Sequence, residues 1–299
     1  MLITKRIPLL LLIFSVGCTS ETNNTGLNQI DGSDIDSSLN ENRKEHLNSD
    51  LTLVEEITGE QDVVTNKSDS LDLLPPKETL QLENFHEYIN LTKFLNTHVS
   101  SSGKVNYKSI AKDKDRLNFI IHEFETNYPI ANWTKNQKLS YWINVYNLFT
   151  IKLIVDNYPV TSIKKIAAKP WDKKFISLDD NKLSLNDIEH GIIRKQYNDP
   201  RVHFALNCAS ESCPILLNKA YRAGVLSSQL TAQTKKFLSD SSKNDFSDSN
   251  NIKISQIFDW YKNDFTKNGT LIDFLNNYLR DKLQSPTIDY LDYSWSLNQ

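Results

Sequence analysis

The chain has 299 residues, of which 39% are hydrophobic and 24% are charged, and its formal net charge at pH 7 is −3. This length is sufficient for one well-packed domain together with further segments. The basic residues are spread along the sequence rather than massed in one run, which argues against a nucleic-acid-binding protein. Glycine occurs only 8 times and no phosphate-binding loop is found, which argues against nucleotide chemistry.

The N-terminal residues have the pattern of an export signal. Lys5 and Arg6 precede an apolar run from Ile7 to Val16, which is too short to cross a bilayer as a mature helix. The following Gly17-Cys18 pair resembles a bacterial lipoprotein cleavage site. We therefore expect a signal peptide at 1–17, lipidation (palmitate) of Cys18, and a membrane-anchored protein of the bacterial cell envelope, at the outer membrane. An ordinary signal peptide with an incidental cysteine is the alternative.

Residues 18–84 have a different composition from the rest of the chain. From 19 to 84 there is no Phe, Tyr or Trp, and 15 acidic residues face 4 basic ones. Such a segment cannot bury enough apolar surface to offset the entropy lost on ordering. We expect a disordered acidic tether over 18–84.

Residues 85–299 carry the composition of a folded domain. All five Trp, all twelve Tyr and twelve of the thirteen Phe lie here, with 28 basic and 22 acidic residues. Strand and helix signals are mixed without strict alternation, which favours an α+β fold. We expect a single mixed domain with a central buried helix and a small, mainly antiparallel sheet.

Hydrophobic periodicity, capping residues and turn residues mark the expected elements. Thr134 is a candidate N-cap for the longest helix, and Ser184 with Asp187 resembles a capping box. In chain order we expect a helix at 85–97, an extended piece at 105–107, helices at 115–126 and 135–157, a hairpin of strands 175–178 and 182–183, a helix at 184–193, a strand at 202–206, a helix at 225–238, a strand at 252–254, helices at 256–265 and 271–283, and a strand at 288–293.

The helix expected at 135–157 is apolar on nearly every side from 139 to 155, which predicts that it is buried. Ser140, Asn144 and Asn147 nevertheless form one polar stripe along it. Buried amides need partners, because an unmade hydrogen bond costs about 1–3 kcal/mol. Either these asparagines tie down neighbouring loop backbone, or they line a pocket and orient a catalytic group or a substrate carbonyl.

Two histidines are candidate general bases. Glu189 directly precedes His190 on a short capped helix, and a nearby carboxylate makes histidine a better base. On a regular strand at 202–206, His203 would point away from the face that carries Cys208. The sequence therefore favours His190 over His203.

Cys208 and Cys213 bound a short polar turn followed by a proline. This spacing in an oxidising compartment favours a Cys208–Cys213 disulfide. Alternatively, Cys208 is a nucleophile with His190 as base, while Asn144 or Asn147 orients the imidazole or stabilises an oxyanion. Zinc held by Cys208, Cys213 and His203 or His190 is a further alternative, as are two free structural thiols, and no other cofactor is expected.

Five further motifs lie along this part of the chain: Tyr141 to Asn147, Leu183 to Gly191, Asp199 to Cys208, Ser212 to Pro214, and Tyr290 to Asn298. Together they resemble the domain-of-unknown-function 547 family, and the resemblance runs from about Phe85 to the C-terminus. The resemblance implies no activity and no residue roles, but bacterial members often resemble exported proteins.

Two functions are consistent with these observations. The first is a binding or scaffold module closed by the Cys208–Cys213 disulfide, with an envelope protein, peptide or glycan as its ligand and no nucleic acid. The second is a thiol-dependent hydrolase or acyltransferase that uses Cys208, His190 and their neighbours Glu189, Asn144 and Asn147. The enzyme requires Cys208 and His190 to meet in a cleft, whereas the module requires bonded sulfur atoms.

Overall fold

The computed structural model describes residues 85–299. The expected signal peptide, the lipidated Cys18 and the acidic tether lie outside the described residues. Within the described part of the chain, no helix is both long and apolar enough to cross a membrane.

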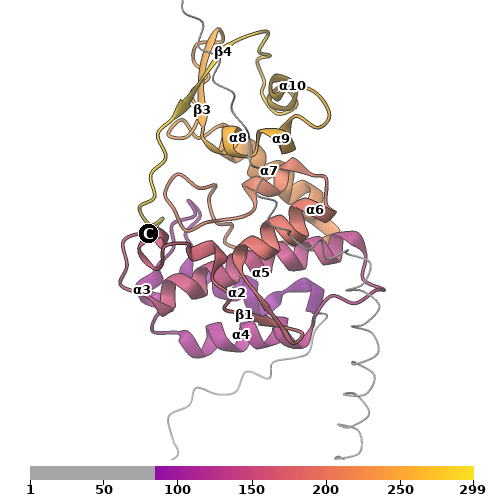
Figure 1. Cartoon of the computed structure of the whole chain (residues 1–299), viewed down its shortest axis with the longest axis vertical. Coiled ribbons are helices and arrows are strands. Elements are labelled where there is room, and N and C mark those ends of the chain that lie inside the picture. Colours follow the sequence, from indigo (N-terminus) through magenta and orange to yellow (C-terminus); the bar gives the residue numbers. More distant parts are fainter. Residues whose placement is uncertain (1–84) are drawn as a thin grey trace, which may run out of the picture.

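Helix α5 (Lys135–Asp156) is the centre of the fold (Figure 1). Its first turn is closed by the expected cap, in which the Thr134 hydroxyl accepts the Gln137 amide and the Gln137 side chain accepts the Thr134 amide. Every residue from Leu139 to Val155 is buried except Lys152, which is half-buried and pairs with Asp156 at 2.7 Å. The expectation of a buried central helix is confirmed.

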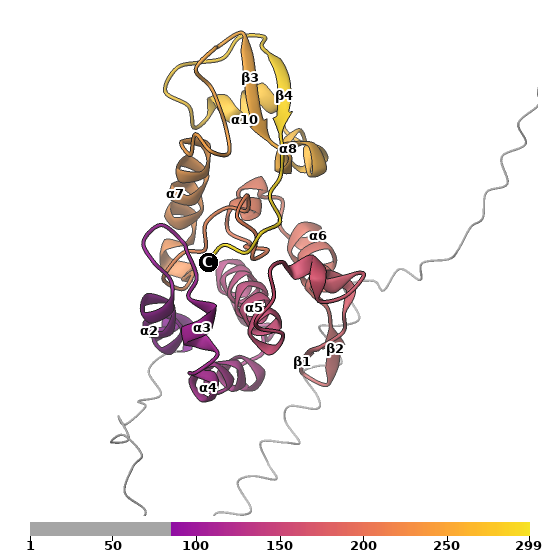
Figure 2. The same ribbon diagram turned by 90° about the vertical axis from the view of Figure 1, so that its left-hand side faces the viewer.

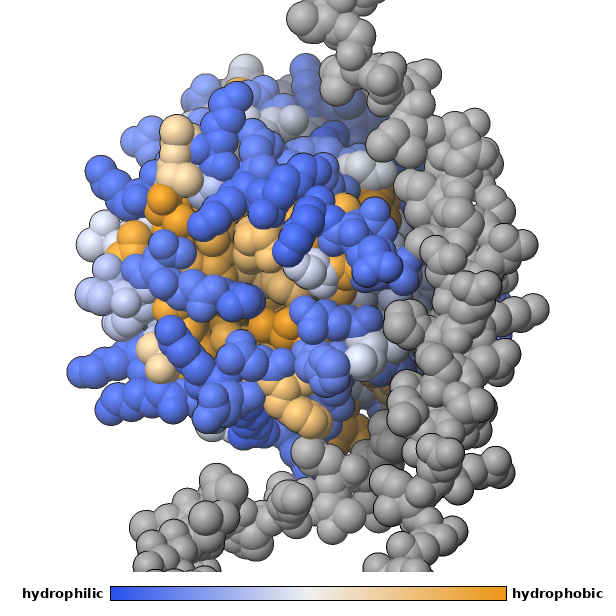
Figure 3. Space-filling model, turned by 60° about the horizontal axis from the view of Figure 1, so that its bottom comes forward, coloured by the Kyte–Doolittle hydropathy of each residue, from blue (hydrophilic) through white to orange (hydrophobic). Residues whose placement is uncertain are grey.

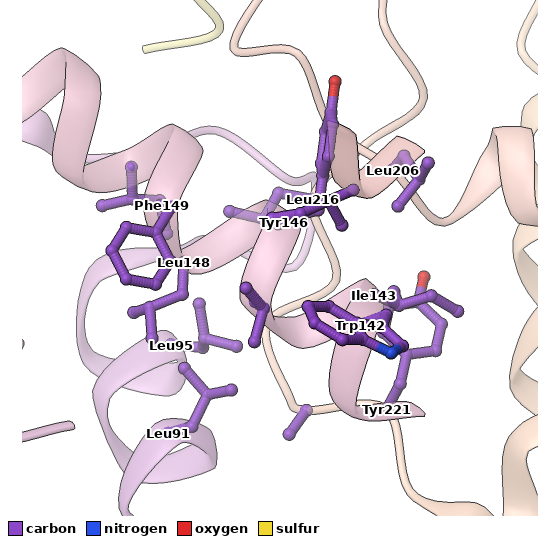
Figure 4. Packing of buried hydrophobic residues seen from close by; sticks show 14 of the residues in the cluster. Leu91, Leu95, Trp142, Ile143, Tyr146, Leu148, Phe149, Leu206, Leu216 and Tyr221 are labelled. Carbon is purple, nitrogen blue, oxygen red and sulfur yellow. The ribbon is translucent and has the colours of Figure 1, made fainter. Parts of the chain in front are cut away.

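The first helices of the domain pack around α5. Figure 4 shows side chains leaving α5 in several directions, with Phe149 and Leu148 on the side of Leu91 and Leu95, and Trp142 and Ile143 on the side of Tyr221. These side chains belong to one hydrophobic core, and the elements that precede α5 in the chain pack against it. The elements are η1 (Phe85–Glu87), α2 (Ile89–His98), α3 (Tyr107–Ile110) and α4 (Lys114–Thr126).

The expected hairpin and the helix after it are present. After η2 (Ile163–Lys165) and η3 (Pro170–Asp172), β1 (Ile176–Leu178) and β2 (Asn181–Leu183) pair antiparallel. Asp179 and Asp180 join them with φ of 48° and 58°, the left-handed values that a tight hairpin turn requires. The Ser184 amide and hydroxyl both donate to Asp187 Oδ2 at 2.6 Å and start a π-helix, η4 (Asp187–Ile193), which leads into α6 (Arg194–Gln196).

The strand expected at 202–206 is wrong, because residues 202–204 belong to a 3-10 helix, η5 (Pro200–Phe204), and 205–206 are not in a strand. Pro200 stands at its first position, where the missing N–H costs nothing. The Asp199 side chain caps the turn by accepting the Arg201 amide at 3.1 Å, and it also pairs with the Arg201 guanidinium at 2.7 Å. These local caps outweigh the β propensity of the sequence. Because the segment is not a strand, its side chains do not alternate between two faces, and His203 need not point away from Cys208.

The C-terminal third builds a second, smaller hydrophobic core above the first (Figure 2). Its two strands pair in parallel, in register from Asn251 with Thr287 to Ser255 with Leu291. The α+β class is thus confirmed, with one antiparallel and one parallel two-stranded sheet in the described residues. The elements are η6 (Ala223–Val225), α7 (Leu226–Leu238), β3 (Asn251–Ser255), α8 (Ile257–Trp260), α9 (Lys262–Phe265), α10 (Leu271–Asn276) and β4 (Thr287–Leu291).

After β4 the chain returns to the larger core, where its end lies near the middle of the molecule (Figure 2). Leu297 forms a bridge with Ser210, and the Asn298 amide donates to the Ala209 carbonyl at 3.2 Å. The returning segment therefore lies directly against the turn that contains the two cysteines.

On the face of the molecule shown in Figure 3, hydrophobic residues gather in the middle and hydrophilic ones surround them.

Replacing Thr134 by Ala should destabilise the domain by about 1 kcal/mol, because α5 loses the side chain that caps its first turn. Urea denaturation followed by circular dichroism measures this change. Thr134→Ser keeps the hydroxyl and should remain close to wild type. Equal losses in both variants would show that the cap hydrogen bond does not stabilise α5.

Candidate functional site

Cys208 and Cys213 face each other across a tight turn between η5 and α7. They are free thiols in this structure rather than the expected disulfide, and their sulfur atoms lie 2.8 Å apart. Cys208 is partly exposed, whereas Cys213 is only 4% exposed. The Cys208 amide donates to Cys213 Sγ at 2.9 Å. The turn thus presents one sulfur to a solvent-accessible site and keeps the other beneath it.

Buried Asn207 holds both ends of this turn. Its side-chain NH₂ donates to the Pro214 carbonyl at 2.7 Å, and its side-chain oxygen accepts the Ala209 amide at 2.9 Å. The same oxygen accepts the Asn298 side chain at 3.2 Å. Ala209 has φ of 62°, a left-handed value that is unusual for a residue with a Cβ. The Asn207 hydrogen bonds hold this conformation.

The surroundings of Cys208 favour its thiolate. Burial alone would raise the pKa of this thiol, but hydrogen bonds from Cys213, from the Ser210 side chain and amide, and from Tyr293 outweigh burial and lower the pKa to about 7. The Ser210 and Tyr293 hydroxyl oxygens lie 3.1 and 3.3 Å from Cys208 Sγ. Burial and the neighbouring Cys208 raise the pKa of Cys213 well above its ordinary value. Cys208 is therefore the sulfur that ionises first.

An imidazole–carboxylate pair stands near the thiols. His203 Nε2 lies 2.8 Å from Asp264 Oδ2, and Arg194 donates to the same oxygen at 2.6 Å. The hydrogen bond from His203 is the largest cause that holds the pKa of Asp264 well below its usual range, so this group stays an ionised acceptor. No hydrogen bond within 85–299 engages His203 Nδ1. The carboxylate thus fixes a tautomer that leaves Nδ1 free to accept a proton.

Tyr261 connects this pair to Glu189. Its ring stacks on the His203 imidazole with centroids 3.9 Å apart and planes inclined by 28°. Its hydroxyl donates to Glu189 Oε1 at 2.6 Å. Burial and the Glu189 charge raise the pKa of Tyr261 far above its ordinary value, so it remains a donor. Tyr261 therefore orients both an imidazole and a buried carboxylate.

Both cysteines, His203, Tyr261 and Glu189 line one pocket with a volume of about 200 Å³. The pocket lies between the two hydrophobic cores, because α8 of the smaller core and the cysteine turn of the larger core both line it. Its polar lining includes Glu189, His203, Cys208, Tyr261 and Tyr293, and its aromatic lining includes Trp171, Trp260 and Trp295.

His190 and Asn144, two of the predicted site residues, do not line the pocket. His190 is exposed, and its Nδ1 lies 2.6 Å from Arg194 Nη1. The Asn144 amide group exchanges two hydrogen bonds of 2.9 Å with the Tyr221 backbone. The structure thus brings together Cys208, Glu189 and His203, and leaves His190 outside the pocket.

Asn147 also ties down backbone, at a position next to the thiols. It donates to the Ala205 carbonyl at 2.9 Å and accepts the Asn207 amide at 2.8 Å. The first interpretation of the two asparagines, that they hold loop backbone, matches these contacts. Asn147 reaches the thiols only indirectly, by fixing the residues just before Cys208.

Sequence reasoning missed Asn207, Tyr261, Asp264 and Tyr293. Asn207 and Tyr293 lie inside two of the motifs noted in the sequence, and those motifs marked both residues as candidates for the site. Tyr261 and Asp264 lie 72 and 61 residues from Glu189 and His203 along the chain, and no local pattern distinguishes them.

For the zinc alternative, the His, Cys, Asp and Glu side chains of residues 85–299 form no group of three or more that could hold a metal ion.

Residues 130–238 match the family model described as "Protein of unknown function, DUF547". The match extends from the segment before α5 to the end of α7 and includes Glu189, His203 and both cysteines. Tyr261, Asp264 and the closing segment lie outside it, so the matched region is shorter than the resemblance expected from the motifs. No curated protein and no solved structure matches the chain.

Alkylation of Cys208 by iodoacetamide should rise with pH through a midpoint near 7 and then level off, because only the thiolate reacts. Mass spectrometry of the chain alkylated for short times at pH 5 to 9 gives this profile. Tyr293→Phe removes one hydrogen bond to the sulfur and should move the midpoint upward. A midpoint above 8.5 in the unmodified chain would contradict the lowered pKa.

Asn144→Ala and Asn147→Ala should each destabilise the domain by about 2–4 kcal/mol, because each leaves buried backbone groups without partners. Only Asn147→Ala should also slow the alkylation of Cys208 at pH 7, since only Asn147 holds the backbone before the thiol. Urea denaturation and alkylation rates separate the two effects. Equal alkylation rates in the two variants would show that this contact does not position Cys208.

Proposed function

We propose that this protein is a thiol-dependent acyl-transfer enzyme, a hydrolase or acyltransferase, with Cys208 as nucleophile and His203 as general base. The supporting observation is that a thiol with a lowered pKa shares one pocket with a histidine that a carboxylate orients. His203 takes the role that sequence reasoning gave to His190, because it lines the pocket and His190 does not.

The reaction would begin with attack of the Cys208 thiolate on a carbonyl carbon. A new C–S bond forms, and the electron pair of the carbonyl moves to its oxygen. The Ser210 and Tyr293 hydroxyls lie 3.1 and 3.3 Å from Sγ and would donate hydrogen bonds to that developing negative charge. The electron pair on the oxygen then restores the carbonyl, the bond to the leaving group breaks, the leaving group takes a proton from solvent water, and a thioester remains on Cys208.

The second half of the reaction needs a base. Water or an acceptor alcohol or amine loses a proton to His203 Nδ1 as it attacks the thioester carbonyl, and the Cys208 thiolate leaves. Asp264 accepts the Nε2 proton of His203 in a hydrogen bond at 2.8 Å, which stabilises the imidazolium that forms. Arg194 holds Asp264 in place from the other side at 2.6 Å. Asp264 and Arg194 are thus positioning residues.

The size and lining of the pocket limit the substrate. A volume of about 200 Å³ is below the range of about 300–1,000 Å³ that holds a drug-sized ligand. Aromatic side chains dominate its walls, while Glu189 is a buried carboxylate that disfavours an anionic group beside it. A short, uncharged acyl group carried on a larger alcohol or amine fits this site.

The location follows from the N-terminal signal. Export with lipidation at Cys18 would hold the enzyme on the cell envelope, and the polar segment at 18–84 would let the domain reach substrates away from the anchor. The disulfide-closed binding module has less support, because the cysteines are free thiols in this structure.

Mixing the full chain with p-nitrophenyl acetate should release p-nitrophenol in a burst of one equivalent, and mass spectrometry should place one acetyl group on Cys208. Cys208→Ala should abolish the burst. His203→Gln should slow turnover after the burst by at least about 100-fold, the usual size of a general-base effect. Stopped-flow absorbance and peptide mapping measure both phases.

His190→Gln is the matched control, because it changes a histidine nearby that lies outside the pocket. It should retain wild-type burst and turnover. Slow turnover in His190→Gln with normal turnover in His203→Gln would assign the role of general base to His190. Acetylation at other residues without a burst would contradict the proposal that the protein is an acyl-transfer enzyme.

A further inference from the structure

In acyl transfer the contact between the two sulfur atoms serves only to favour the Cys208 thiolate. In that reaction one thiol forms the new bond, and the Cys213 side chain is only 4% exposed. Yet the two Sγ atoms lie 2.8 Å apart, while a disulfide bond is about 2.05 Å long, so a movement of about 0.8 Å brings the sulfurs to bonding distance. Both cysteines line the pocket, but they differ in exposure, because Cys208 is partly exposed whereas Cys213 is buried.

We propose that Cys208 is a site of reversible oxidation by small hydroperoxides, and that Cys213 resolves the oxidised form as an intramolecular disulfide. In the first step the Cys208 thiolate attacks the distal oxygen of the hydroperoxide. The O–O bond breaks, the alcohol or water leaves, and Cys208 becomes a sulfenic acid. In the second step Cys213 attacks that sulfur and releases water.

Overall, two thiols and one hydroperoxide give one disulfide, one alcohol or water from the hydroperoxide, and one further water. The two thiols lose two electrons, which the hydroperoxide gains. An external dithiol returns the pair to the reduced state by thiol–disulfide exchange.

The environment of Cys213 suits a resolving thiol. The burial that keeps it from the oxidant also raises its pKa, and the adjacent Cys208 adds to this. Oxidation of Cys208 removes the neighbouring thiolate charge, so Cys213 ionises more readily once a sulfenic acid has formed. The Cys208 amide, 2.9 Å from Cys213 Sγ, is already placed to donate to the Cys213 thiolate. The pair is thus arranged for oxidation at Cys208 first and resolution by Cys213 second.

The backbone also holds the pair in place. Asn207 bonds to the Pro214 carbonyl and to the Ala209 amide, which keeps the two ends of the turn together. The disulfide expected from the spacing of the cysteines then corresponds to the oxidised form of this site, and the free thiols correspond to the reduced form. In the oxidised form Cys208 cannot act as a nucleophile, so oxidation also stops acyl transfer.

The test uses the full chain with Cys18→Ser, which leaves Cys208 and Cys213 as its two cysteines. After reduction, the protein is exposed to one equivalent of hydrogen peroxide in the presence of dimedone, a trap for sulfenic acids, and then to iodoacetamide. The product should have lost the mass of two hydrogen atoms, carry no dimedone and resist alkylation until dithiothreitol is added.

Two variants separate the steps. Cys213→Ser should instead carry dimedone on Cys208, since no thiol resolves the sulfenic acid. Cys208→Ser should leave Cys213 reduced at the same dose. A dimedone yield on Cys208 as high in the parent chain as in Cys213→Ser would overturn the proposal, as would a parent chain that stays fully reduced. These readouts follow sulfur oxidation alone, so they are independent of the p-nitrophenyl acetate assay that tests acyl transfer.

Discussion

The buried side chain of Asn207 is the constraint on which the candidate site depends. Its amide group contacts the backbone at Pro214 and Ala209 and the side chain of Asn298, while its own backbone amide is held by Asn147 of the central helix. One residue thus joins α5, both ends of the cysteine turn and the C-terminal segment. Because an unpaired buried amide is costly, all these contacts form together or the turn loses its shape. The left-handed Ala209 persists for the same reason.

The site lies where two hydrophobic cores meet, and each core supplies part of the chemistry. The larger core positions Cys208, Glu189 and His203, whereas the smaller core brings Tyr261 and Asp264 against them. The contacts between the two sets are hydrogen bonds and one stacked ring pair, all in the partly buried space between the cores. Polar contacts at such a junction fix orientation more strictly than apolar packing does, because they require particular distances and angles.

The two cysteines have opposite properties although they lie only five residues apart. Burial raises the pKa of both thiols, but Cys208 also receives hydrogen bonds from Cys213, Ser210 and Tyr293, and together these lower its pKa. Tyr293 comes from the segment after β4, which passes over the turn on its way to the C-terminus. The reactivity of Cys208 therefore depends in part on a residue 85 positions away in the chain.

The sequence by itself determined the parts of this protein that local chemistry controls. The cap at Thr134, the burial of α5 and the Asp179-Asp180 hairpin follow from patterns within a few residues, and the structure contains them. Even local patterns can mislead: the apolar run at 202–206 predicts a strand, whereas the structure has a 3-10 helix there, because the Asp199 cap and Pro200 outweigh β propensity. Only the tertiary structure decided that His203 rather than His190 lies in the pocket with Cys208. That choice depends on Asp264, 61 residues from His203, and no short-range pattern encodes a contact made by packing two cores together.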